Sequence, residues 1–181
     1  MSEALPREVH AVMISVGGVR VLLPNAIVAE IAPLAGVEKI DGAPAWLLGR
    51  MPWRERALPL VSLSMLTGAA TQEETKHARV AVLKTHDGKE DLPYFGLIAQ
   101  GLPRLITITP DLLVRTDGGE ELAPGTSAHV LVRSDQAIIP DLNWIETKVK
   151  KMKERLRTGR ADVFFEKVLL CVCSSGTSLQ L

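Results

Sequence analysis

The chain has 181 residues, with 21 Lys and Arg against 21 Asp and Glu, so its formal net charge is zero. A neutral chain has no global field that draws it to nucleic acid or to an anionic membrane, so any basic patch has to be local. Apolar residues make up 46% of the sequence, as in ordinary globular proteins, and no apolar run reaches the roughly 18 residues of a membrane span.

The sequences at the two ends of the chain indicate the cellular compartment. The start, MSEALPREVH, contains acidic residues and lacks an apolar segment, so we expect no signal peptide. Cys171 and Cys173, the two cysteines of the sequence, are too close together for an ordinary disulfide or a complete zinc site. The lack of a disulfide framework fits a reducing compartment, so we expect a cytoplasmic protein.

The N-terminal part predicts a hairpin followed by a helix. Residues 9–16 and 19–24 are rich in β-forming side chains, and Gly17 and Gly18 between them are a turn signal. From residue 25 to residue 32 the apolar spacing becomes helical, and Asn25 is suited to the N-cap. We therefore expect a β-hairpin and then a short helix.

The rest of the chain predicts short strands and one long helix. In chain order we expect a turn of helix at 44–49, strands at 58–63, 79–85 and 92–109, a long connection at 110–128, a hairpin at 129–142 turning at 134–136, and a helix at 144–158. Many short strands with few helices favour small β-barrels.

The sequence offers no support for catalysis. It contains neither a phosphate-binding glycine motif nor the signatures of zinc proteases or serine hydrolases. Its adjacent carboxylates lie in polar connecting stretches, whereas a general acid needs an apolar cleft. The four histidines lack metal-ligand spacing: His10, His77, His86 and His129. We expect no enzyme activity, no metal, no cofactor and no small-molecule substrate.

The predicted C-terminal helix carries a basic face. Its cations are Lys148, Lys150, Lys151, Lys153, Arg155 and Arg157. One interpretation is a small β-barrel module that binds nucleic acid through this helix. The other is a solvated helix face with support from Glu146 to Lys150, one turn apart. Because aromatic residues make up only 4% of the sequence, stacking platforms are scarce, and we expect no nucleic-acid partner.

The stretch GAPAWLLGRMPWRERALPLVSL, from residue 42 to residue 63, resembles the signature of the CheW-like domain family. The matching positions are Gly42, Pro44, Trp46, Gly49, Arg54 and Pro59. The segments before and after it resemble the family's other strands in the same order, over roughly residues 8–146. The resemblance implies a mainly β fold, with two intertwined five-stranded SH3-like barrels, a short helix in the N-terminal half and a C-terminal helix.

The resemblance also implies a function. Members of this family are non-catalytic adaptors that couple the cytoplasmic tip of chemoreceptors to a CheA-type histidine kinase, at receptor arrays on the membrane. The family's receptor-contact surface corresponds to Val28, Gly49 and Arg54, with Glu30 and Trp53 as neighbours. From the residues alone, Val28 could equally be a core residue and Gly49 a turn glycine. Arg54, with several donors for a carboxylate or for helix-end carbonyls, is the strongest candidate.

Two departures mark a divergent member. Where the family has Asn-x-Arg-Gly, this chain has Pro52, Trp53, Arg54 and Glu55, so a side chain replaces a glycine that can take positive φ. Ser62 stands where the family often has Asp. Such divergence suggests an alternative chemosensory system, such as one that controls twitching motility by type IV pili.

We divide the chain into a CheW-like domain at 8–146, a basic helix at 147–160 and a tail at 161–181. The tail is apolar and then rich in Ser and Gly, and the resemblance does not reach it. It could pack on the domain, remain disordered, or mediate self-association, because exposed apolar side chains need a cover.

Overall fold

The computed structural model describes residues 7–69, 76–86 and 92–174, and the side chains of these residues up to 158. Over this part of the chain the elements are β1 (Val9–Val16), β2 (Val19–Pro24), the 3-10 helix η1 (Asn25–Ile27), β3 (Val28–Pro33), β4 (Leu47–Trp53), β5 (Arg56–Val61), α1 (Leu63–Leu66), β6 (Arg79–Lys84), β7 (Tyr94–Ile108), β8 (Leu113–Arg115), β9 (Thr126–Val132), β10 (Asp135–Pro140) and α2 (Leu142–Ser174). The mainly β class with a C-terminal helix, predicted from the sequence, is confirmed.

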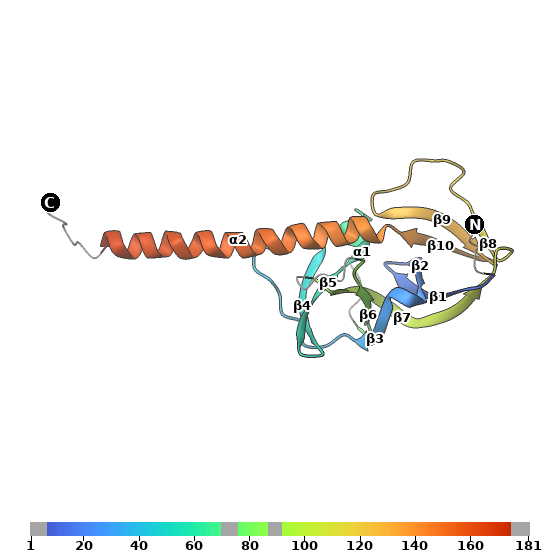
Figure 1. The fold of residues 1–181 in the computed structure, drawn as a ribbon, viewed down its shortest axis with the longest axis horizontal. Coiled ribbons are helices and arrows are strands. Elements are labelled where there is room, and N and C mark those ends of the chain that lie inside the picture. Colours follow the sequence, from blue (N-terminus) through green and yellow to red (C-terminus); the bar gives the residue numbers. More distant parts are fainter. Residues whose placement is uncertain (1–6, 70–75, 87–91, 175–181) are drawn as a thin grey trace, which may run out of the picture.

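The strands form two units that share the long strand β7 (Figure 1). Its first half pairs with β6 and, in parallel, with β5, so it belongs with β3, β4, β5 and β6. Its second half pairs with β1, which leads through β2 to β10, β9 and β8. The first hairpin of the chain therefore sits beside its last strands, and the two units are intertwined.

Three apolar clusters hold these strands together. One lies inside the unit of β3 to β6 and includes Met51, Trp53 and Leu60. A second lies inside the other unit. The largest joins the two units, and Phe95 and Ile145, both fully buried, belong to it. Since the joining cluster is the largest, we expect the two units to unfold together.

The helix predicted at 25–32 is wrong. One turn of 3-10 helix, η1, is followed at Val28 by β3, which pairs antiparallel with β6. The register sets Ile31 opposite the fully buried Ala81. The pairing with β6 determines the conformation of this segment, because the two β-branched residues of β3 fit a pleated strand as well as a helix.

Two further predictions move by a few residues. The turn of helix expected at 44–49 is absent there, because β4 already begins at Leu47. The hairpin predicted at 129–142, formed by β9 and β10, turns at Arg133 and Ser134. Val132 pairs with Asp135, and Arg133 has a φ of 57°. The turn therefore lies slightly before the predicted 134–136.

The C-terminal helix is longer than predicted at both ends. It begins at Leu142, where the side chain of Asp141 accepts a hydrogen bond from the backbone N–H of Trp144 at 3.0 Å. Ile145 and Val149 are buried against the strands, as their helical spacing predicts. The helix continues to Ser174 and leads away from the strands (Figure 1). Part of the predicted tail is thus helical, and residues 175–181 lie outside the described part.

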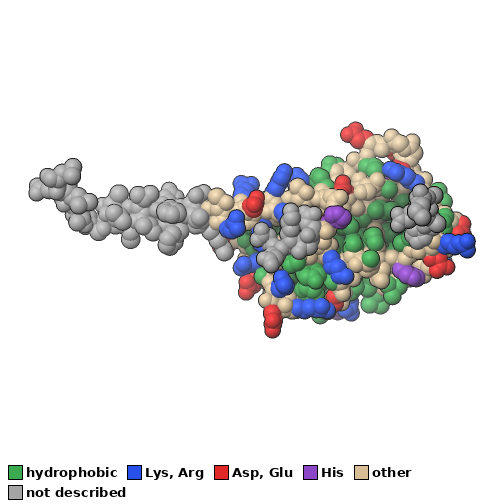
Figure 2. All heavy atoms as spheres, viewed as in Figure 1, with side chains coloured by type: hydrophobic (Ala, Val, Ile, Leu, Met, Phe, Trp, Pro, Cys, Tyr) green, Lys and Arg blue, Asp and Glu red, His purple; other side chains and the backbone are tan. Residues whose placement is uncertain are grey.

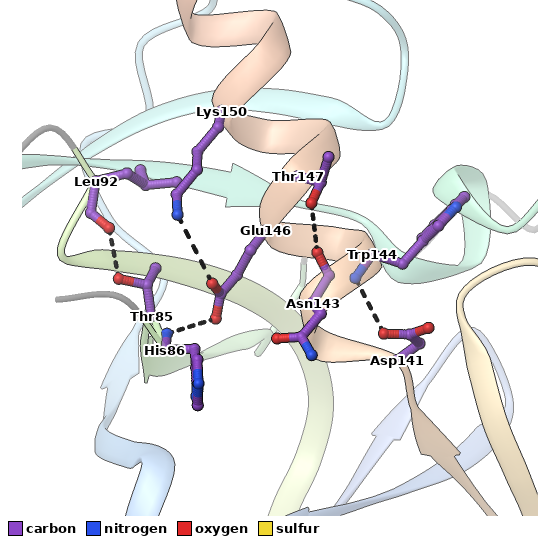
Figure 3. A network of polar contacts seen from close by, with 9 residues as sticks. All are labelled: Thr85, His86, Leu92, Asp141, Asn143, Trp144, Glu146, Thr147 and Lys150. Atoms are coloured by element: carbon purple, nitrogen blue, oxygen red, sulfur yellow. Dashed lines mark hydrogen bonds and ion pairs between the residues drawn. The ribbon is translucent and has the colours of Figure 1, made fainter. Parts of the chain in front are cut away.

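A buried carboxylate ties α2 to the end of β6 (Figure 3). Glu146 is 5% exposed, and its Oε1 accepts the backbone N–H of His86 at 2.8 Å. Its Oε2 lies 4.0 Å from Nζ of Lys150, which is the pairing expected from the sequence. The helix is therefore fixed to the domain by polar contacts as well as by its apolar face.

We expect Glu146→Ala to lower the free energy of unfolding by about 1–3 kcal/mol, because it leaves a partly buried N–H without its acceptor. Urea unfolding followed by circular dichroism measures this. Glu154→Ala, which removes an exposed carboxylate from the same helix, is the matched control and should change stability by less than about 0.5 kcal/mol. Equal effects of the two variants would contradict the anchoring role.

Candidate docking site

The hairpin of β4 and β5 turns through two residues that both have left-handed backbone. Trp53 pairs with Arg56, which leaves Arg54 at φ 43° and Glu55 at φ 62° as the turn. Positive φ at both positions matches the type I′ turn, which suits the twist of a hairpin. Glu55 occupies the position where the family pattern has glycine, and its backbone still takes the conformation that glycine favours.

We expect Glu55→Gly to raise the free energy of unfolding by about 0.5–1 kcal/mol, because it relieves a side chain from a left-handed position. Thermal and urea unfolding check the prediction. Glu120→Gly, at an exposed loop position without positive φ, should instead be neutral or destabilising. A stabilised Glu120→Gly together with an unchanged Glu55→Gly would overturn this interpretation of the turn.

The turn brings together three of the predicted site residues, which we call the docking cluster: Glu30, Trp53 and Arg54. Oε2 of Glu30 accepts Nε1–H of Trp53 at 3.1 Å and a guanidinium N–H of Arg54 at 2.9 Å. The guanidinium carbon of Arg54 also lies 4.8 Å from the centre of the Trp53 ring. Residues from β3 and from the β4–β5 turn, far apart in the sequence, thus form one polar and aromatic surface.

The docking cluster is buried at Trp53 and exposed at Arg54. Trp53 is only 7% exposed, and its ring meets Tyr94 edge-on with centroids 4.9 Å apart. The side chain of Arg54, in contrast, is 65% exposed, and that of Glu30 is 39% exposed. An exposed ion pair of this kind adds little stability, so its main effect is to hold the guanidinium in one orientation. Arg54 keeps further donors for a second carboxylate or for carbonyl groups.

Gly49 has a structural requirement of its own. It is buried in β4 at φ +145°, beside a backbone bridge between Glu38 and Arg50. A Cβ at this position would lie 2.3 Å from the carbonyl oxygen of Glu38. The close approach of two backbones explains the glycine without a partner, and a receptor contact at Gly49 stays a prediction.

Val28 lies at the start of β3, opposite Leu83 of β6. It is half-buried and packs against the cluster that joins the two units. Both interpretations from the sequence remain open, because one side of a half-buried valine can be core while the other meets a partner. Its strand β3 is the terminal strand of the sheet path and carries Glu30, so both residues lie at a sheet margin.

Sequence reasoning did not nominate Tyr94 or Glu38. Tyr94 packs against Trp53, and Glu38 bridges to Arg50 through both its backbone and an ion pair at 3.6 Å. Tyr94 is the one tyrosine of the sequence, and this rarity could have marked it as a candidate. Its position beside Trp53, however, depends on the pairing of β5 with β7, which the sequence does not reveal. Glu38 lies in a connection with no pattern of its own.

The described residues contain no group of His, Cys, Asp and Glu that could hold a metal ion. Within the same residues, no helix is both long and apolar enough to cross a membrane. The docking cluster presents an exposed arginine on the surface of two intertwined β-units.

The family model of the CheW-like domain matches residues 10–148, so the chain belongs to the CheW-like domain family. The scaffolding protein TtCheW from Thermoanaerobacter tengcongensis has a similar fold, with a TM-score of 0.62 at 17% identity over 78% of this chain and 90% of that one. No curated protein matches. Membership of this family supports an adaptor role in chemotaxis and signal transduction.

Proposed function

We propose that the protein is a non-catalytic adaptor that couples chemoreceptors to a CheA-type histidine kinase. The observation that carries the proposal is the docking cluster, because the family pattern nominates Arg54 and the structure joins it to Glu30 and Trp53. The cluster lies inside the matched family domain. It has the features of a docking point, with a rigid aromatic base and an exposed arginine.

The proposed partner surface is the cytoplasmic tip of a chemoreceptor, which is a helical hairpin. Arg54 can bind a carboxylate of the tip or the free carbonyls at a helix end. Trp53 fixes the guanidinium, and the open side of Val28 adds an apolar contact. An amphipathic helix that docks in this way needs an apolar floor with a few polar fixing groups.

Pairwise pull-downs with purified components test the proposal. The full chain should retain a receptor tip and, separately, the regulatory domain of a CheA-type kinase. If the folded protein retains neither partner, the adaptor proposal fails.

The alternative, nucleic-acid binding through α2, has weaker support. Its cations at Lys148, Lys151, Arg155 and Arg157 are exposed. Lys148, however, lies over the ring of Trp144 at 5.2 Å, which gives it a structural contact. The alternative requires retention on nucleic acid that falls steeply with salt, and no retention at low salt would exclude it.

The cellular setting follows from the adaptor proposal. We infer a cytoplasmic protein that is recruited to receptor arrays at the membrane. The departures at Glu55 and Ser62 favour an alternative chemosensory system, and twitching motility is one candidate output. A histidine kinase and a receptor encoded beside this gene would support the assignment, and the identity of those neighbours would identify the output.

A further inference from the structure

A cavity of about 580 Å³ lies where α2 passes the hairpin of β4 and β5. Leu92 and Pro93, which lead into β7, and Tyr94, its first residue, form a third side. The helix contributes residues 149, 153, 156 and 157, which share one face at helical spacing. Segments from three different parts of the chain thus line one space that is open to solvent on one side.

The walls of this cavity are apolar and aromatic. Leu58, Pro59 and Leu156 supply aliphatic surface, and the aromatic residues Trp53 and Tyr94 also line the cavity. Those two rings are held edge to face at a centroid distance of 4.9 Å. A preformed cavity of several hundred cubic ångströms with such walls matches the sites that bind small organic molecules.

The charges at the cavity all have the same sign. Its lining contains Arg50, Arg56, Lys153 and Arg157, and no Asp or Glu stands among the described residues that line it. Figure 2 shows Lys and Arg side chains around the base of α2. Of the two arginines on the hairpin, Arg50 has an ion pair with Glu38 at 3.6 Å, and its buried Nε has no hydrogen-bond partner among the described residues.

We propose that this cavity binds a small organic anion with a flat apolar body and one acidic group. The aromatic and aliphatic walls bury the body, and the arginines bind the acid through charge-assisted hydrogen bonds. An apolar cation would meet only like charge, so the sign of the charges sets the specificity. Binding at this cavity does not require the adaptor function.

Trp53 connects the cavity to the docking cluster. Trp53 lines the cavity, and its Nε1–H donates to Glu30. A ligand bound beside Trp53 therefore alters the surroundings of that N–H, which makes the indole signal of Trp53 a reporter of occupancy.

The experiment titrates the full chain with naphthalene-2-sulfonate and follows the tryptophan indole signals by NMR, with Trp53 assigned through Trp53→Phe. We expect saturable binding with a Kd below about 1 mM and a shift of the Trp53 signal. The double variant Arg56→Gln and Arg157→Gln should raise Kd at least about tenfold, because both charge-assisted contacts are lost.

Two matched controls decide the outcome. Arg155→Gln removes an exposed arginine of the same helix that does not line the cavity, and it should leave Kd unchanged. The cation 2-naphthylmethylammonium has a similar apolar body, and it should bind at least about tenfold more weakly. Absence of saturable binding, equal binding of the cation, or an equal loss in Arg155→Gln would each overturn the proposal.

Discussion

Gly49→Ala is expected to lower the free energy of unfolding by about 3 kcal/mol or more. The backbone at φ +145° has a conformation that residues other than glycine rarely adopt. The new Cβ would also lie 2.3 Å from the carbonyl oxygen of Glu38. Both strain and overlap act on the bridge between Glu38 and Arg50, which two hydrogen bonds of 2.8 Å hold together. Urea unfolding of the variant measures the loss.

Gly42→Ala is the matched control for this prediction. Gly42 also has positive φ, at 74°, but a Cβ there meets nothing within 4 Å. It should therefore cost only the backbone strain, about 1 kcal/mol. If Gly49→Ala keeps full stability yet loses receptor binding, Gly49 is a direct contact and the structural explanation is wrong.

Arg54→Glu is expected to reduce affinity for a receptor tip at least tenfold, or by about 1.4 kcal/mol or more. The change removes the exposed cation that the partner binds. It also places a second carboxylate beside Glu30, which in the unmodified chain accepts a hydrogen bond from Arg54 at 2.9 Å. Isothermal titration of the receptor tip with the full chain measures the change in Kd.

The fold of the variant should survive, because an exposed ion pair contributes at most about 1 kcal/mol. Arg155→Glu reverses an exposed charge far along the sequence on α2 and serves as the matched control, with affinity expected to stay unchanged. A similar loss of affinity in both variants would show a general charge effect instead of docking at Arg54.

Local patterns predicted the hairpins at 9–24 and 129–142 and the C-terminal helix, but neither β4 nor the strand that carries Glu30. Gly17 and Gly18 set the first turn, and the apolar spacing of Ile145 and Val149 set the buried face of α2. For residues 28–33 the spacing fitted a helix, while the deciding contact was β6, about fifty residues later. Pairing between distant strands has no local signature, so such an error is expected where the periodicity is short.

For the candidate site, too, the sequence predicted single residues but not the contacts between them. The family pattern nominated Val28, Gly49 and Arg54, and Glu30 and Trp53 were added as their neighbours in the sequence. The shared acceptor, Oε2 of Glu30 on β3, joins the β4–β5 turn to β3 only once the strands are folded together. The support of Tyr94 beneath Trp53 likewise depends on the parallel pairing of β5 with β7.

The structure gives a physical account of Trp53 and of the departure from the family pattern at Glu55. Trp53 is part of the buried cluster of its unit, so it fills space in the fold as well as shaping the surface. Glu55 keeps the turn conformation of the glycine that it replaces. The backbone of the turn thus has the positive φ that glycine favours, although the side chain at this position is that of glutamate.

The most direct test of the coupling claim is a bridging measurement. A receptor tip is immobilised, the regulatory domain of the kinase is supplied in solution, and kinase retention is measured with the full chain, without it, and with Arg54→Glu. We predict that the kinase is retained only with the unmodified chain. Kinase retention that does not change on adding the folded chain would contradict the adaptor account.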